Sequence, residues 1–126
     1  MNRSLQITDF NCNIYNHTHK NLLVKVTEYL FKLGFQANLK GFSYTREAII
    51  LCIESHIINI SAKKIYDKIA EKHNVKPTSV ERAIRYAIEG SWNRGSFEWK
   101  IYLPTYTYCP ANSEFIAESA ELIMIN

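Results

Sequence analysis

The sequence lacks the features that would mark a membrane or secreted protein. No apolar run is long enough to cross a bilayer, and the first twenty residues contain no apolar signal-peptide centre. The three cysteines, Cys12, Cys52 and Cys109, are odd in number and include no C-x-x-C pair, which favours reduced thiols. We therefore expect a cytoplasmic protein that has no membrane partner.

The sequence also lacks the side-chain groupings that catalysis and metal binding need. No histidine, His56 included, stands near a plausible nucleophile, and no cluster of carboxylates suggests a hydrolytic metal site. Cys12, His17 and His19 have the spacing of metal ligands. A structural zinc site needs about four ligands, however, and the sequence contains no second group of ligands to complete it. We expect no catalytic residue, no metal and no cofactor, so the protein should not be an enzyme.

Length and patterning indicate one domain. A chain of 126 residues is long enough to bury a core of its own. Residues 1–20 are polar and have no sustained period, so we interpret them as an irregular lead-in. Residues 21–126 alternate helical patterns with breakers, and we expect an all-α domain there.

The stretch from residue 60 to residue 95 predicts two helices joined by a tight corner. Ser61 stands where an N-cap belongs, Asn74 tolerates the left-handed conformation that ends a helix, and Pro77 prevents continuation. Thr78 and Glu81 fit a capping box at the start of the second helix. The two apolar stripes have helical spacing and consist of Ala62, Ile65, Tyr66, Ile69 and Ala70, then Val80, Ala83, Ile84, Ala87 and Ile88.

The opposite face of this pair is polar and basic. Residues 60–95 carry eight Lys and Arg against four Asp and Glu, whereas the remainder carries seven against eight. A helix-turn-helix needs such long donor side chains on its second helix, although an ordinary helical hairpin with a solvated face fits the pattern equally well. The outward positions are Ser79, Arg82, Arg85, Tyr86, Glu89 and Asn93, with Lys63, Lys64, Lys68 and Lys72 on the first helix.

Flanking segments supply the remaining core. The pattern predicts a first helix over residues 22–33 that Gly34 ends, a connector over 35–41, and a second helix over 44–58. The second helix is apolar almost all round, which is typical of the buried centre of a bundle. Arg46 near its start could reach a phosphate or a neighbouring carboxylate, and both remain open.

The segment after Gly95 is aromatic and irregular. Strand or ordered loop is possible there, and its aromatic side chains either fill the core or provide a stacking platform for bases. A last helix follows, with Asn112 or Ser113 as its cap and Glu114 in its first turn. Its outer face is acidic and should point away from nucleic acid. The inward positions are Phe115, Ile116, Ala120 and Ile123, and the outer ones Glu114, Glu118 and Glu121.

Four separated blocks carry a more specific signal: LGFQANLKGFSYTREAI (33–49), SVERAIRYAIE (79–89), WNRG (92–95) and PANSEFIA (110–117). In this order they resemble the C-terminal effector domain of the sporulation regulator Spo0A, from about residue 22 to the end. The resemblance implies an all-α domain of about six helices that binds double-stranded DNA through a helix-turn-helix. Such domains ordinarily follow a phosphorylatable receiver domain, and they activate and repress transcription at sporulation onset.

The resemblance also implies roles for single residues. Glu81, Arg82 and Arg85 match positions that read base edges, and Ser79 or Thr78 matches positions near the DNA backbone. An arginine forks onto guanine O6 and N7, while a glutamate accepts from cytosine N4. If Glu81 closes a capping box, the same oxygen is not free for a base. The full set that we expect on DNA is Thr78, Ser79, Glu81, Arg82, Arg85, Tyr86, Lys76, Lys64, Arg46 and Lys40.

Several departures from the family pattern bear on function. No receiver domain precedes the module, so the chain is either an excised domain or a stand-alone protein, and its own lead-in from Met1 favours the latter. A stand-alone protein would lack phosphorylation-driven dimerisation. Tyr86 and Asn38 stand where the family usually shows histidine, Ser79 replaces an arginine, and the segment from Gly95 to Asn112 is shorter and less basic. These changes affect base preference and contact with RNA polymerase.

The sequence therefore predicts a sequence-specific, sporulation-related transcription regulator that reads the major groove with the helix at about 78–94. We expect a monomer when free and a dimer on tandem DNA sites, with RNA polymerase as a further partner. The alternative is an interaction module that pairs with a full-length Spo0A-type regulator or with RNA polymerase and lacks useful DNA binding of its own.

Overall fold

The computed structural model describes residues 19–55 and 61–125, which form six helices and no strand. A first helix spans residues 19–32. It is followed by α2 (Lys40–Glu54), α3 (Ala62–His73), α4 (Pro77–Arg94), α5 (Phe97–Tyr102) and α6 (Asn112–Ile125). The predicted all-α class is confirmed. Within the described ranges, no helix has both the length and the apolar character needed to span a membrane.

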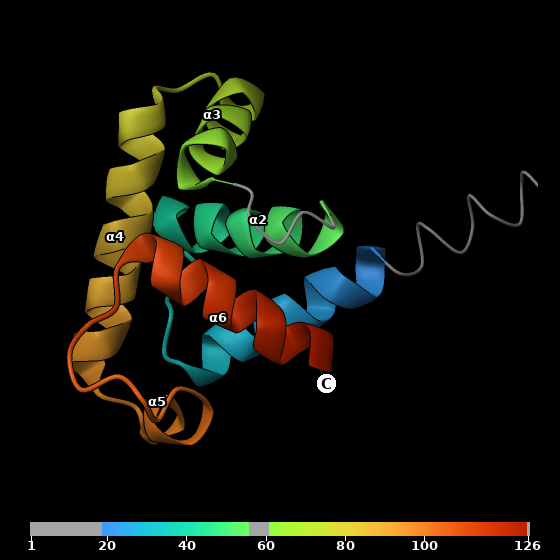
Figure 1. The fold of residues 1–126 in the computed structure, drawn as a ribbon. Helices are drawn as coiled ribbons and strands as arrows, with labels where there is room; N and C mark the ends of the chain where they lie inside the picture. The colour runs from blue at the N-terminus through green and yellow to red at the C-terminus, as the bar shows by residue number, and fades with distance from the viewer. Residues whose placement is uncertain (1–18, 56–60, 126) are drawn as a thin grey trace, which may run out of the picture.

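Helix α2 lies at the centre of the domain, with α3, α4 and α6 packed around it (Figure 1). Its side chains Ala48, Ile49 and Ile50 are buried, and the first helix adds Val26 and Leu30 to the same core. A helix that is apolar on most sides must be covered on most sides, because exposed apolar surface is unfavourable in water. The predicted buried centre is thereby confirmed.

The start of α2 was predicted too late in the chain. The helix begins at Lys40 rather than at Tyr44, and Gly41 lies inside it. A glycine in the sequence suggests that a helix is interrupted there. In α2, however, Gly41 allows the helix to pack closely against α4. A Cβ at Gly41 would lie 2.3 Å from the carbonyl oxygen of Ala83 and 2.8 Å from the Cβ of Ala87. The expected end of this helix at residue 58 lies outside the described residues.

The first helix also begins earlier than predicted, at residue 19 instead of 22, so the expected lead-in over 1–20 overlaps its first turn. Its end agrees with the prediction, because Gly34 takes a left-handed φ of 90°. The greater part of the lead-in, residues 1–18, lies outside the described residues.

The aromatic segment after Gly95 forms helix α5 and a series of turns, so the expectation of strand or ordered loop was wrong for residues 97–102. Trp99 is buried, and its Nε1 donates to the Ser91 hydroxyl at 2.9 Å. The Ser91 hydroxyl in turn donates to the carbonyl of Leu33 at the end of the first helix. A helix of six residues is too short to show a period, and these tertiary contacts hold it in place.

Helix α6 packs as expected but is capped differently. Its four predicted inward residues are buried and its three outer glutamates are exposed. Neither Asn112 nor Ser113 caps it, because both are already inside the helix. The Glu114 carboxylate instead reaches back and accepts from the backbone N–H of Ala111 at 2.9 Å. The side chain of Asn112 is thereby left available for contacts with other helices.

The contact at Gly41 yields a stability prediction. Gly41→Ala would force α2 and α4 apart, because the added methyl group meets backbone atoms that cannot move separately. We expect a loss of about 1–3 kcal/mol in the free energy of unfolding, measured by chemical denaturation.

The matched control is Gly90→Ala in α4, where the new Cβ would meet only the end of the Arg94 side chain at 3.4 Å. Alanine favours helix over glycine, so this variant should be neutral or gain up to about 1 kcal/mol. Equal losses in both variants would contradict the close-packing argument.

Candidate nucleic-acid interface

Helices α3 and α4 and the corner between them form the helix-turn-helix. The Ser61 side chain caps α3 by accepting from the backbone N–H of Lys64 at 3.3 Å. At the other end, Asn74 takes the left-handed conformation, with φ 54° and ψ 48°. The backbone N–H of Val75 then donates to the carbonyl of Ala70 at 3.0 Å, which closes the helix end. The predicted roles of Ser61 and Asn74 are confirmed.

The start of α4 differs from the predicted capping box. The helix begins at Pro77, Lys76 occupies the N-cap position, and no side chain makes a capping hydrogen bond. Pro77 fits the first helical position because its ring presets φ and it has no N–H to satisfy. Thr78 therefore lies within the helix and cannot cap it, so the capping box was wrong. Glu81 is released from that role, and its conflict with base reading disappears.

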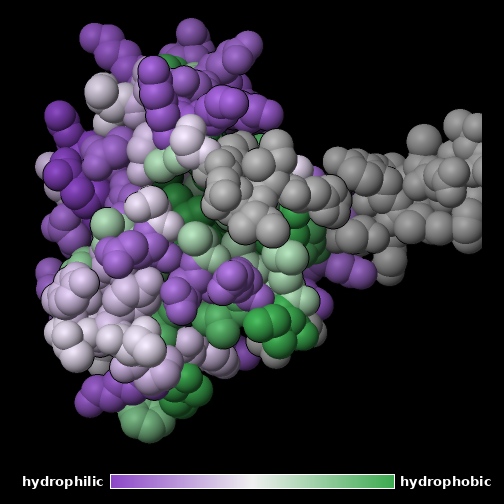
Figure 2. Space-filling view, viewed as in Figure 1, coloured by the Kyte–Doolittle hydropathy of each residue, from purple (hydrophilic) through white to green (hydrophobic). Residues whose placement is uncertain are grey.

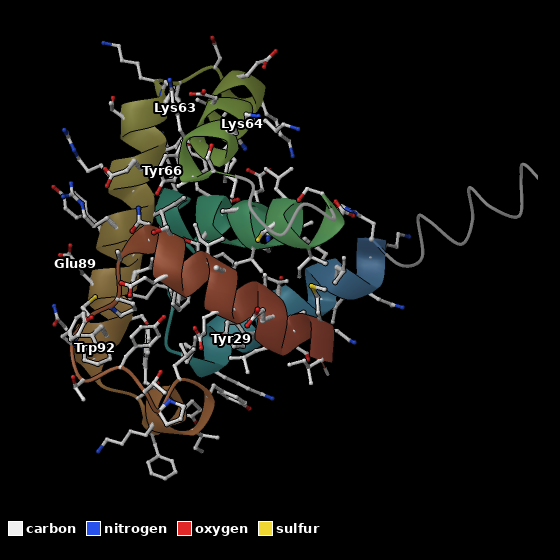
Figure 3. All side chains as sticks on the ribbon, viewed as in Figure 1. Tyr29, Lys63, Lys64, Tyr66, Glu89 and Trp92 are labelled. Atoms are coloured by element: carbon white, nitrogen blue, oxygen red, sulfur yellow. The ribbon has the colours of Figure 1, made fainter. Side chains whose placement is uncertain are left out.

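Helix α4 is buried along one stripe and exposed along the opposite one. Val80, Ile84 and Ile88 are inaccessible to solvent, as the predicted stripe requires. Figure 3 shows Glu89 on the side of α4 that faces away from the other helices. All six predicted outward residues are exposed: Ser79, Arg82, Arg85, Tyr86, Glu89 and Asn93. The structure thus gathers these six residues, Arg82 and Arg85 among them, on one exposed face, whereas Glu81 is only partly exposed.

Contacts within this face are weak enough to be exchanged. The Nε of Arg85 lies 3.7 Å from the Glu81 carboxylate, and its guanidinium lies 5.6 Å from the ring centre of Tyr86. An exposed ion pair of this kind contributes at most about 1 kcal/mol. Within residues 19–55 and 61–125, Arg82 has no hydrogen-bond or ion-pair partner. Both arginines can therefore turn toward a ligand at little cost.

The outer surface of α3 adds positive charge beside α4. Lys63 and Lys64 are exposed, and the hydrophilic surface in Figure 2 covers α3 and the adjoining part of α4. Lys72 has an internal partner, since its Nζ donates to Glu47 of α2 at 2.6 Å. His73 Nε2 lies 2.8 Å from the other oxygen of the same carboxylate. Glu47 thus holds the end of α3 against α2.

Two predicted DNA contacts come from α2. Lys40 is exposed in the first turn of α2 and precedes Gly41, the glycine that touches α4. Arg46 donates to the Thr27 hydroxyl at 3.2 Å and lies over the Phe42 ring, 5.4 Å from its centre. Among the described residues, no carboxylate lies within ion-pair distance of Arg46. Arg46 packs toward the first helix, apart from the exposed face of α4.

Of the three residues with metal-like spacing, the structure describes only His19. Cys12, His17 and His56 lie outside the described residues, and His19 Nδ1 lies 2.7 Å from the Glu54 carboxylate. Among the described residues, no three potential ligands come together in a metal-like cluster. Cys109 is a free thiol, and burial raises its pKa, so it is held in the unreactive protonated form.

One polar junction behind the reading face escaped sequence reasoning. The Asn112 side chain donates to the Tyr66 hydroxyl at 3.1 Å and to the carbonyl oxygen of Glu81 at 3.0 Å. It therefore connects α6 to both helices of the helix-turn-helix. Partial burial is the main reason that the Tyr66 pKa is raised, so the hydroxyl stays protonated. The pattern marked Asn112 only as a possible helix cap, and no local signal identifies its distant partners.

This arrangement agrees with the comparison of the sequence with known protein families. Residues 26–123 match the family described as sporulation initiation factor Spo0A C terminal. The chain belongs to the Spo0A C-terminal family. The matched range includes the whole of α2 to α5, most of α6 and the second half of the first helix. The Spo0A C-terminal family consists of DNA-binding domains of sporulation regulators and is not an enzyme family.

The cap geometry yields a prediction that separates the two helices. Ser61→Ala removes an observed capping bond, so it should lower the free energy of unfolding by about 0.5–2 kcal/mol. Thr78→Ala removes no cap and should change that free energy by less than about 0.5 kcal/mol. Thermal and chemical denaturation measure both. A loss for Thr78→Ala as large as that for Ser61→Ala would contradict the observed start of α4.

Proposed function

We propose that the protein is a sequence-specific transcription regulator of sporulation that reads DNA by placing α4 in the major groove. The observation that carries the proposal is the division of α4 into a buried apolar stripe and a free face bearing Arg82 and Arg85. An α-helix with its side chains is about 10–12 Å wide, which matches a major groove of about 12 Å. The Spo0A C-terminal family membership supports this use of the helix.

Three side chains in the first half of α4 read base edges under this proposal. Arg82 and Arg85 each present a planar fork to guanine, and Glu81 accepts from cytosine. In the free protein, Glu81 and Arg85 partly neutralise each other at 3.7 Å. When the protein binds DNA, this weak ion pair breaks and both side chains contact bases instead. Tyr86, with 61% of its surface exposed, supplies an apolar contact beside them.

Phosphate contacts come from the groups around the start of α4. Lys76 and Lys64 are exposed, and Thr78 and Ser79 lie in the first turn of α4. The Lys76 side chain makes no capping hydrogen bond at this helix end, so the positive dipole there can attract a phosphate. Lys40, exposed beside Gly41 in the first turn of α2, is a further phosphate contact under this proposal. Arg46 contributes only if it leaves Thr27 for the DNA backbone.

A second function is favoured by a different surface. The exposed side of α5 carries Phe97 and Ile101, which are 69% and 55% exposed. Figure 2 shows hydrophobic surface at the lower edge of the molecule, where α5 lies. Such a face suits an interaction module that pairs with a full-length Spo0A-type regulator or with RNA polymerase. Gel shifts at several salt concentrations separate the two functions, because only the first gives salt-dependent DNA binding.

We expect the free protein to be a monomer at micromolar concentration. It has one reading helix, and a single helix-turn-helix module binds one half-site weakly, whereas tandem sites strengthen binding if two copies touch on DNA. Sedimentation with and without a tandem-site duplex measures the assembly. A stable dimer without DNA would contradict this expectation.

Paired substitutions test base reading. Arg82→Ala removes a donor fork, so it should cost about 1–3 kcal/mol on the preferred site and little on random DNA. Lys76→Ala removes a charge at the corner, so it should weaken binding to all sequences alike and reduce the salt slope by about one unit. The preferred site comes from selection in a random DNA library, and titrations at several salt concentrations give the affinities.

The opposite pattern would overturn the proposed docking. If Arg82→Ala weakened preferred and random DNA equally while Lys76→Ala changed site preference, α4 would not lie in the major groove. If neither substitution changed binding at low salt, the interaction module would be the better explanation, because the protein would not be using this face for DNA.

A further inference from the structure

The side chain of Asn112 joins three helices at a single point. Asn112 is the first residue of α6 and is only 8% exposed. Its amide nitrogen has two N–H groups, and both find acceptors: the Tyr66 hydroxyl on α3 and the Glu81 carbonyl oxygen on α4. Both N–H groups of the Asn112 side chain are therefore bonded within the protein, and neither remains to donate to DNA.

The acceptor on α4 is well placed to control base reading. The Glu81 carbonyl belongs to the residue whose side chain pairs with Arg85, and Arg82 and Arg85 follow within about one turn of helix. A carbonyl oxygen has two lone pairs, so it can accept from Asn112 and also from the backbone of α4. The hydrogen bond from α6 thus holds the first half of α4 against shift or rotation.

We propose that Asn112 is a positioning residue that sets the rotation of α4 and thereby selects the base sequence without touching DNA. This inference rests on the proposed function. Hydrogen bonds to base edges weaken steeply with misalignment, whereas the attraction between a lysine and a phosphate falls slowly with distance. A small rotation of α4 therefore weakens the preferred site far more than random DNA.

An effect of Asn112 on the rotation of α4 can be distinguished by measurement from an effect on the stability of the fold alone. A substitution that only unfolds part of the protein removes the same fraction of binding-competent molecules from every titration. It lowers the affinities for preferred and random DNA by the same factor, and their ratio stays constant. A substitution that misaligns α4 lowers the ratio itself.

The test compares Asn112→Ala with Ser119→Ala in the full chain. Asn112→Ala loses two part-buried side-chain hydrogen bonds of α6 and Ser119→Ala loses one buried one, in neither case with a change in charge. Ser119 bonds the Tyr29 hydroxyl at 2.8 Å on the first helix, so its loss leaves the contacts of α6 with α3 and α4 intact. Binding is measured on the selected site and on a random duplex of the same length at one salt concentration.

We expect Asn112→Ala to lower the ratio of preferred to random affinity about tenfold and Ser119→Ala to leave it unchanged. The salt slope should be the same in both variants, because no phosphate contact is lost. Tyr66→Phe removes one of the two acceptors, so it should lower the ratio in the same direction by a smaller factor.

The outcomes distinguish this inference from the proposed function. A wild-type protein that shows no preference for any DNA sequence would overturn the proposed function. A wild-type preference with an unchanged ratio in Asn112→Ala would overturn only the positioning role. If Asn112→Ala fails to fold by circular dichroism, Tyr66→Phe decides, and an unchanged ratio in that variant overturns the inference.

Discussion

Helices α2 and α4 approach each other so closely at Gly41 that no Cβ fits between them, and the arrangement of the domain depends on this contact. A Cβ at Gly41 would lie within 2.3 Å of the Ala83 carbonyl. The contact lies at the middle of α4, on the side opposite to its free face. Because α2 is also covered by α3 and α6, the position of α4 on α2 sets the position of the reading face relative to the whole body.

Polar contacts hold α4 near both of its ends. Asn112 of α6 bonds the Glu81 carbonyl near the N-terminal end. At the other end, Ser91 donates to the carbonyl of Leu33, and Arg94 Nε donates to the carbonyl of Gly34 at 2.8 Å. A helix held at its centre by packing and near both ends by hydrogen bonds is prearranged for binding, which lowers the entropy lost when it meets a ligand.

The helix-turn-helix could be predicted from sequence because its signals are local. Apolar spacing, the capping Ser61, the left-handed Asn74 and the helix-breaking Pro77 each act within a few residues. The false capping box at Thr78 arose from the same local reasoning, which placed the N-cap two residues after the observed one at Lys76. The structure decides for Pro77, which occupies the first helical position.

The sequence by itself determined the all-α class, the two stripes of the helix-turn-helix and the residues of its exposed face, because a helical period assigns each side chain to a side. Only the tertiary structure decided that Gly41 belongs inside α2, that residues 97–102 are helical, and that Asn112 joins α6 to α3 and α4. Each of these depends on atoms far away in the chain: the Ala83 carbonyl, the buried Ser91 hydroxyl, and the Glu81 carbonyl. Packing and hydrogen bonding between distant segments leave no periodic signal, so local pattern cannot reveal them.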